Sequence, residues 1–344
     1  MLILFAIGCK DSTSPSGDDV DTSPVEFFDV DLIGMDYVFS TSISYDGSMI
    51  AVYGSKHGGK QIIEVIDTKT KAKLCEFPAS GSNVYGKPMN FSDDGTKFLV
   101  ENLVVNPMTG NVLHEFKSNP VRLLPDGTAV IFLSSTQTTT TFSLYSVANG
   151  SKIKEFQINE PAVFSVAGTR GSSQIILMSN PEFDAVRVIN WDISSNSKVG
   201  DFTVQNSTFL NGGAFSTDFS ILCLPTIFQD DQRNFYNSQT GEKINKEEFI
   251  YPESTKGFFG DIAIANDQTF MIQSFNVAKL EIYPPSLYSI KEVKRTKILT
   301  LPPSANSRRL SNFAYSGDNR FFSVEGYVSS TDPNLVSIRI WKLR

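Results

Sequence analysis

Short runs of apolar and β-branched residues, separated by turn dipeptides, extend over most of the chain. The first complete unit reads FSTSISY over Phe39–Tyr45 and, after an Asp-Gly turn signal, MIAVYGS over Met49–Ser55. Two further runs, Gln61–Asp67 and Lys73–Phe77, complete it. Such runs between Gly, Pro, Asn and Asp predict antiparallel strands. Because no twelve-residue window carries helical spacing with caps, we predict an all-β chain.

This four-strand unit recurs along the chain. The turn between its first and second strands returns at intervals of 32 to 51 residues. Its positions are Asp46, Asp94, Asp126, Arg170, Asp218, Asp267 and Asp318. A four-stranded unit of ~40–50 residues is the period of β-propeller blades. We therefore predict a seven-bladed β-propeller of four-stranded antiparallel sheets over residues 25–344.

The two ends of this predicted ring complete one another. The last unit has only three strands before Arg344, whereas Val25–Ile33 (VEFFDVDLI) is strand-like and has no partner of its own. Pairing these segments removes an open sheet edge. We predict that the N-terminal strand completes the last blade.

Several short motifs resemble those of WD-repeat-like propellers and their bacterial relatives. They are IRIWKLR at the C-terminus, VRVINWDIS in the fourth unit, and the turns ISYDG, FSDDG and LPDG. The resemblance covers residues 25–344 as a pattern and implies the fold. The chain departs from eukaryotic WD repeats because it has no Gly-His dipeptide and its one Trp-Asp is Trp191-Asp192. We therefore expect apolar packing between the blades.

The N-terminal residues resemble a targeting signal. Met1–Gly8 reads MLILFAIG, and the step Ala6-Ile7-Gly8-Cys9 resembles the end of a bacterial lipoprotein signal peptide. The resemblance implies cleavage before Cys9, lipidation of that residue, and a Bacteroidota-type outer-membrane lipoprotein of the cell envelope, periplasmic or surface-exposed. We expect a basic segment upstream of Met1. A buried strand with an ordinary core cysteine is the alternative.

Residues 10–24 (KDSTSPSGDDVDTSP) contain one apolar side chain, Val20. Such a segment buries too little surface to fold and predicts a flexible tether. The predicted organisation is a signal-peptide remnant over residues 1–8, the lipidated cysteine and tether over 9–24, and the propeller over 25–344.

Composition narrows the classes of function. The chain has 30 Lys and Arg against 37 Asp and Glu, a net charge of −7, which argues against nucleic-acid binding. No later apolar run is long enough to span a bilayer, so a lipid anchor is the expected membrane attachment. Cys75 and Cys223 lie in apolar runs and predict buried free thiols. The motifs of serine hydrolases, zinc proteases, nucleotide-binding loops and dithiol redox sites are absent from the sequence.

The predicted blade layout distinguishes two faces. The short turns between first and second strands share one face, the short-turn face, with the turns between third and fourth strands. Long segments, including residues 180–185, 228–233, 251–260 and 328–334, fall on the opposite, long-loop face. Binding residues favour loops held by a rigid scaffold, so we predict the site there. The candidates are Tyr37, Tyr85, Glu182, Phe183, Asp184, Asp230, Asp231, Phe258, Phe259, Arg308, Arg309, Tyr327 and Asp332.

These features favour a membrane-tethered, non-catalytic, monomeric propeller that binds a protein or glycan partner through its long-loop face. The alternative is a propeller enzyme, a lactonase-like or lyase-like hydrolase with its site at the central channel. A purely structural envelope protein is the third hypothesis. We expect no cofactor, although Asp230 and Asp231 are oxygen ligands of the type Ca²⁺ uses.

Overall fold

The computed structural model describes fifteen stretches of the chain. They are residues 25–56, 58–79, 89–136, 138–159, 165–182, 184–207, 213–227, 229–247, 249–250, 259–276, 281–282, 286–299, 314–318, 321–328 and 336–343. All regular structure within these stretches is β-strand. The all-β prediction is therefore confirmed.

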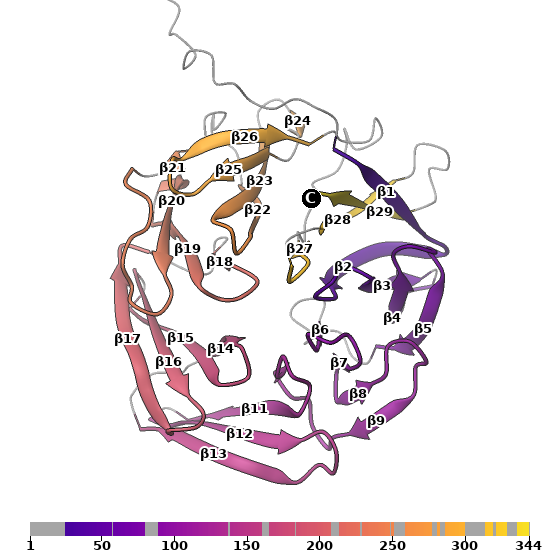
Figure 1. Ribbon diagram of the computed structural model, residues 1–344, viewed down its shortest axis with the longest axis horizontal. Helices are drawn as coiled ribbons and strands as arrows, with labels where there is room; N and C mark the ends of the chain where they lie inside the picture. The colour runs from indigo at the N-terminus through magenta and orange to yellow at the C-terminus, as the bar shows by residue number, and fades with distance from the viewer. Residues whose placement is uncertain are drawn as a thin grey trace, which may run out of the picture.

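The described strands form seven antiparallel sheets arranged around a central axis (Figure 1). Six of them, here called blades 1 to 6, are each built from consecutive strands, with the first strand innermost and the last at the rim. The remaining sheet, the closing sheet, combines strands from both ends of the chain. The units predicted from the sequence thus correspond to six contiguous blades and one sheet shared by the termini.

The first three blades have these strands. Blade 1 contains β2 (Met35–Ile43), β3 (Met49–Lys56), β4 (Lys60–Asp67) and β5 (Lys73–Pro78). Blade 2 contains β6 (Met89–Phe91), β7 (Phe98–Val100), β8 (Leu103–Val105) and β9 (Val112–Glu115). Blade 3 contains β10 (Arg122–Leu123), β11 (Ala129–Ser135), β12 (Thr140–Ser146) and β13 (Lys152–Ile158).

The next three blades follow the same order. Blade 4 contains β14 (Ser165–Arg170), β15 (Gln174–Glu182), β16 (Ala185–Asp192) and β17 (Ser197–Gln205). Blade 5 contains β18 (Ala214–Phe215), β19 (Ile221–Thr226), β20 (Gln229–Asn237) and β21 (Phe249–Ile250). Blade 6 contains β22 (Phe259–Ile264), β23 (Thr269–Asn276), β25 (Ser286–Ser289) and β26 (Lys294–Ile298), with the short β24 (Glu281–Ile282) beside β23.

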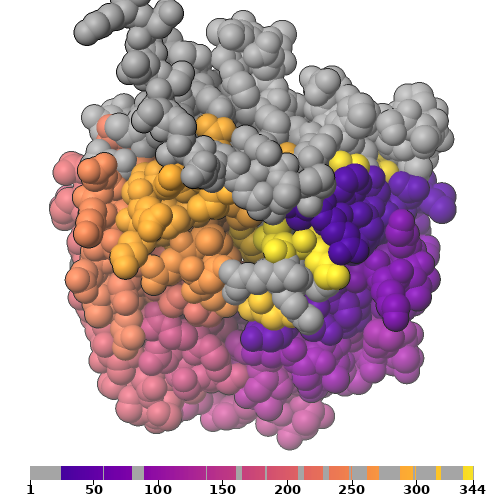
Figure 2. Space-filling model, turned by 45° about the horizontal axis from the view of Figure 1, so that its top comes forward, coloured from indigo at the N-terminus to yellow at the C-terminus, as the bar shows by residue number. Residues whose placement is uncertain are grey.

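The closing sheet joins the two ends of the chain. Its order is β1 (Phe27–Leu32), β29 (Val336–Lys342), β28 (Phe321–Val328) and β27 (Ala314–Tyr315). β1 runs antiparallel to β29 in an unbroken register from Phe27–Trp341 to Leu32–Val336. Figure 2 shows the C-terminal residues, in yellow, against the N-terminal strand in indigo. The prediction that an N-terminal strand completes the last sheet is confirmed.

Side chains reinforce this closure. The guanidinium of Arg339 donates from Nε and Nη2 to the two carboxylate oxygens of Asp29, at 2.8 and 2.9 Å. The carbon at the centre of the same guanidinium lies 3.6 Å from the centroid of the Phe27 ring. Ser337 donates its hydroxyl to Asp31 at 2.6 Å. Bidentate arginine–carboxylate pairs fix geometry as well as energy, so they specify the register of β1 on β29.

Apolar clusters fill the space between neighbouring sheets. Phe142 and Phe156 of blade 3 pack edge-on against Trp191 of blade 4, with ring centroids 5.7 and 6.1 Å apart. Trp341 of the closing sheet is fully buried with Leu287 of blade 6. Each sheet therefore depends on its neighbours for burial of its faces.

The fourth strand of blade 5 is shorter than the fourth strands of blades 1, 3 and 4. Here β21 covers Phe249–Ile250, and Lys243 makes only an isolated bridge with Tyr236. The amide oxygen of Asn245 accepts the backbone N–H of Phe235 at 2.8 Å. A side chain thus replaces the backbone acceptor that a continuous strand would supply.

Cys75 and Cys223 are free thiols, as predicted; Cys223 is buried, whereas Cys75, also predicted to be buried, is only half-buried. Burial raises the pKa of Cys75 to about 11. Burial also raises the pKa of Cys223 to about 12, against the opposing charge of Arg233. Neither thiol has the lowered pKa that a nucleophilic cysteine needs.

The closure pair generates a first prediction. Arg339→Met should lower the free energy of unfolding by about 2–3 kcal/mol, the range for hydrogen bonds to charged groups, because this arginine is 6% exposed. The matched control is Arg187→Met in blade 4, where Arg187 is 24% exposed and holds Asp201 in the same bidentate way at 2.9 and 2.7 Å. That loss should be about 1 kcal/mol or less. Urea denaturation measures both; equal losses would contradict a special role for the closure.

Candidate functional site

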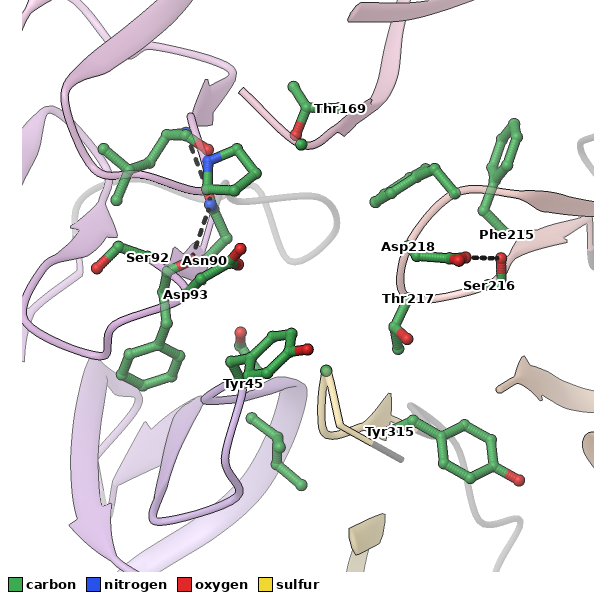
Figure 3. Close-up of a pocket in the computed structure, with 18 of the residues that line it drawn as sticks. Tyr45, Asn90, Ser92, Asp93, Thr169, Phe215, Ser216, Thr217, Asp218 and Tyr315 are labelled. Atoms are coloured by element: carbon green, nitrogen blue, oxygen red, sulfur yellow. Dashed lines mark hydrogen bonds between the residues drawn. The ribbon is translucent and has the colours of Figure 1, made fainter. Parts of the chain in front are cut away.

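A cavity of about 360 Å³ lies on the short-turn face, where the innermost strands end. All seven sheets contribute to its lining, so it is called the central cavity. Figure 3 shows Asn90 and Asp93 on one side of this hollow and Thr217 and Asp218 on the other. A cavity lined by every sheet is a natural place for a ligand to contact the whole ring.

The turns that surround the cavity share one design. In blade 1, the Ser44 hydroxyl donates to Asp46 at 2.8 Å and accepts the backbone N–H of Met49 at 2.9 Å. The same Asp46 oxygen accepts the backbone N–H of Ser48 at 3.0 Å, and Gly47 takes the left-handed conformation at φ 72°. The same serine–aspartate bond recurs in blades 2 and 5 and in the closing sheet. A Ser-x-Asp sequence therefore builds this turn by itself.

These turns give the cavity an acidic rim. Burial opposes ionisation of Asp46, but hydrogen bonds from the Ser48 backbone and from the Ser48 and Ser44 hydroxyls lower its pKa overall. Burial likewise opposes ionisation of Asp94, where bonds from Ser92 and Thr96 lower the pKa. The carboxylates of Asp46 and Asp94 are thus negatively charged at neutral pH.

Hydrogen bonds connect neighbouring turns around the rim. The Asn266 side chain accepts from the Thr217 hydroxyl at 2.6 Å and donates to the Gly317 carbonyl at 3.2 Å, so it links blades 5 and 6 with the closing sheet. Asp318 N–H donates to the Tyr45 carbonyl at 3.0 Å and connects the closing sheet with blade 1. Asn90 of blade 2 bonds the backbone of blade 3 through both its amide atoms. The rim is held as one unit, which favours a preformed site.

Blade 5 departs from the turn design. Phe219 occupies the place that Gly47 has in blade 1, and it takes the same left-handed conformation at φ 59°. Its ring lies against Gly168 of blade 4, so close that a Cβ there would come within 1.8 Å of it. A phenylalanine in this conformation is strained, and such residues persist only where the surroundings hold them.

Arg170 of blade 4 and Ser238 of blade 5 hold the Phe219 carbonyl. Arg170, which stands where the other units have aspartate, donates from Nη2 to the Phe219 carbonyl at 3.0 Å. Ser238 also donates its hydroxyl to this carbonyl and accepts from Arg170. Burial lowers the pKa of Arg170, while the charge of Asp218 opposes that shift. The two departures from the repeat, Arg170 and Phe219, thus support one another.

A third unusual residue, Arg122 of blade 3, lines the cavity at the same place. The central carbon of its guanidinium lies 4.7 Å from the centroid of the Phe219 ring. Burial lowers the pKa of Arg122 to about 10, which leaves it cationic at neutral pH. A cation stacked on an aromatic ring therefore sits within an acidic rim.

A second hollow, of about 720 Å³, lies at the side of the molecule between blades 2 and 3 and is called the lateral hollow. The rings of His114, Phe116, Phe132 and Tyr145 follow one another along it, with centroids 4.5, 5.5 and 5.0 Å apart. The Lys152 ammonium lies 6.0 Å from the Tyr145 ring. This hollow therefore combines aromatic faces with polar groups.

The residues predicted for the long-loop face lie away from the central cavity or outside the description. Tyr37 is 60% exposed in β2, and Glu182 and Asp184 adjoin the turn from β15 to β16. Asp230 and Asp231 were expected in a loop but belong to β20, because its pairing with β19 begins at Gln229. Outside the described residues lie Cys9, Tyr85, Phe183, Phe258, Arg308, Arg309 and Asp332, and outside the described side chains lie those of Asp230, Asp231, Phe259 and Tyr327. A site on this face stays a prediction.

Sequence reasoning missed the central cavity although the sequence carries a signal for it. The turn of blade 5 reads STDFS where blade 1 reads SYDGS. Arg170 is the one non-aspartate in the series of turn positions. A break in a repeated turn motif marks a residue that does something the turn does not require.

The described residues offer no candidate for a metal site or a membrane-spanning helix. No group of three or more His, Cys, Asp and Glu side chains there is placed to hold a metal ion. No helix among them is long and apolar enough to cross a bilayer.

No protein-family model and no curated protein sequence matches the chain. Among solved structures, the β-propeller domain of Cps50 (Swd1) from Myceliophteria thermophila has a TM-score of 0.61 at 9% identity, over 91% of this chain and 98% of that one. The fold is a WD-repeat-like β-propeller. A chain of the mitotic checkpoint complex has a TM-score of 0.59 at 14% identity, over 100% of this propeller and 98% of that chain. U3-55K has a TM-score of 0.57 at 11% identity, over 92% of this chain and 98% of that one.

The contact between Gly168 and Phe219 generates a second prediction. Gly168→Ala should lower the free energy of unfolding by about 1–3 kcal/mol, the cost of overpacking, because its Cβ would meet the Phe219 ring. In a Phe219→Gly background the same substitution should cost less than about 0.5 kcal/mol. A double-mutant cycle by chemical denaturation measures the coupling. Additive effects would show that the ring does not occupy this place.

Proposed function

We propose that this propeller is a non-catalytic scaffold that binds a partner protein at the central cavity of its short-turn face. The observation that supports this most is the rim, in which hydrogen bonds such as Thr217–Asn266 and Asp318–Tyr45 join successive turns. A rigid surface loses little conformational entropy on binding, so its contacts contribute fully to affinity. One structurally similar chain belongs to the mitotic checkpoint complex, so this fold occurs within a protein assembly there.

The proposal moves the site from the long-loop face to the short-turn face. Two features favour the short-turn face: the cavity to which all sheets contribute, and the departures from the repeat gathered beside it. A hydrolase at the centre of the ring, the alternative, needs a nucleophile with a base or a metal. The described lining residues include Ser, Thr and Asp side chains but no His or Cys.

The lateral hollow favours a second candidate, a glycan partner. Aromatic faces beside Glu155 and Asn149 combine the apolar and hydrogen-bonding contacts that a sugar ring needs. Binding of a soluble polysaccharide that is lost on Tyr145→Ala and retained on Tyr45→Ala would support this candidate.

The proposed scaffold is held at a bacterial envelope by a lipid on Cys9 and by the polar tether of residues 10–24. The support for this is the small-residue step before Cys9 and the composition of the tether. A lipid anchor keeps the propeller at the membrane surface, where it meets partners in two dimensions.

Site-specific photocrosslinking tests which face binds. Tyr37 lies near the start of β2 and Tyr45 lies just beyond its end, and they are 60% and 47% exposed, so each accepts p-benzoylphenylalanine without burying it. In cells that express the full chain, the probe at Tyr45 should capture a protein partner, whereas the probe at Tyr37 should not. Ile153, 57% exposed on the outer strand β13, is the control for nonspecific capture. Capture from Tyr37 alone would return the site to the long-loop face.

Mass spectrometry tests the anchor. Full-length protein extracted from the membrane should begin at Cys9 and carry the mass of attached acyl chains. A Cys9→Ser variant should be lost from the membrane fraction, since one substitution removes the lipidation site. Recovery of an unmodified Cys9 with residues 1–8 still attached would contradict the lipoprotein assignment.

A further inference from the structure

Among the described residues, no carboxylate forms an ion pair with Arg122, the cation that lines the central cavity. Within the same residues, the Arg122 guanidinium packs on the Phe219 ring, and the buried Nε of Arg122 makes no hydrogen bond. An arginine has five N–H donors in the plane of its guanidinium. Stacking on a ring uses the face of that plane and leaves its edge for a bidentate acceptor.

A second polar group at the cavity also lacks a partner. Thr169 of blade 4 is 3% exposed and lines the cavity, and its hydroxyl makes no hydrogen bond to any described residue. Buried hydroxyl groups normally have a partner, because leaving one unpaired costs free energy. Arg122 and Thr169 therefore each place a hydrogen-bond donor without an acceptor at the same cavity.

Phe219 has a strained backbone conformation, and its ring contacts the Arg122 guanidinium. Glycine at position 219 would form the same turn without strain, as Gly47, Gly95 and Gly127 do in blades 1 to 3. Phenylalanine requires Gly168 to make room and Arg170 to hold the carbonyl. Gln268 of blade 6 takes the same conformation at φ 63° without such a ring, so it is the contacts of the Phe219 ring with Gly168 and Arg122 that point to a functional role.

We propose that Arg122, stacked on Phe219, is a receptor for one carboxylate, supplied by an acidic side chain within an otherwise basic segment of the partner protein. This rests on the proposed function, and it names the chemistry of the partner. A carboxylate accepts two parallel hydrogen bonds from a guanidinium edge. It also accepts a further bond from a hydroxyl such as that of Thr169.

The rim decides between a carboxylate and a phosphate. Burial raises the pKa of Asp93, and the nearby charges of Asp94 and Asp126 raise it further, so three carboxylates lie close together in this part of the rim. A phosphate carries up to two negative charges and would be repelled more strongly than a carboxylate with one. Lysine or arginine residues on either side of the carboxylate would instead be attracted by the rim. The same geometry therefore selects a single acid flanked by bases.

Three capped peptides test this: Ac-Lys-Lys-Glu-Lys-Lys-NH₂, the same peptide with Gln in place of Glu, and the same peptide with phosphoserine. Isothermal titration with the full propeller should give at least tenfold tighter binding of the Glu peptide than of the Gln peptide. The phosphoserine peptide should bind more weakly than the Glu peptide. Equal affinity for the Glu and Gln peptides would overturn the proposal, and tightest binding of phosphoserine would replace carboxylate with phosphate.

Variants then assign the effect to the site. Arg122→Gln and Phe219→Gly should both reduce the ratio between the Glu and Gln peptides to near one. Phe219→Gly restores the Asp-Gly turn and so keeps the fold, which covers the case in which Arg122→Gln fails to fold. Lys152→Gln is the matched control, because Lys152 is also a cation over an aromatic ring, but in the lateral hollow. If the affinity ratio between the Glu and Gln peptides persists in Phe219→Gly and Arg122→Gln, Arg122 has only a structural role.

The two proposals fail in different ways. Capture of a partner from Tyr45 together with equal Glu and Gln affinities would leave the scaffold in place and remove the carboxylate receptor. A Glu preference that depends on Arg122, without capture from Tyr45, would show a carboxylate site that is not used by a protein in those cells.

Discussion

The pairing of β1 with β29 is the constraint on which the rest of the structure depends. Each blade buries its faces only against its two neighbours, so an open ring would leave two apolar faces and a sheet edge unprotected. The register of six residue pairs, together with the Arg339–Asp29 bonds, closes that gap. The turn of the closing sheet then meets blade 1 through Asp318 N–H and the Tyr45 carbonyl. The geometry of the central cavity is therefore a consequence of where the two chain ends meet.

The repeated turns form the scaffold of the short-turn face, and the residues that depart from the repeat form the candidate site. The Ser-x-Asp turn forms from local hydrogen bonds alone, so it can be repeated without regard to the neighbouring blade. Phe219 and Arg170 break that independence, because the first needs space from blade 4 and the second bonds the backbone of blade 5. Arg122 extends the contact to blade 3. Three successive blades thus meet at one point, which a purely structural repeat does not require.

The sequence was a good guide to the strands and to the closure of the ring, because both follow from local patterns and from counting strands. It was a poor guide to the site. The contact of Arg122 with Phe219 joins blade 3 to blade 5, and its existence depends on how much the ring rotates from one blade to the next. The local sequence pattern of a blade does not specify the rotation between one blade and the next. The loop predicted around Asp230 was wrong for a related reason, since the hairpin between β19 and β20 is tighter than the polar residues suggested.

A receptor on the short-turn face also explains why the turns of this face are short and bonded to one another. A guanidinium recognises a carboxylate only when the edges of both groups lie in one plane, so small displacements cost much of the interaction. Short turns tied to one another hold such a plane, whereas long loops would lose it to their own motion. Phe219 serves the same end, because a ring fixed between Gly168 and Arg122 limits the directions the guanidinium can take. The strain at φ 59° is then part of the cost of placing the ring against Arg122.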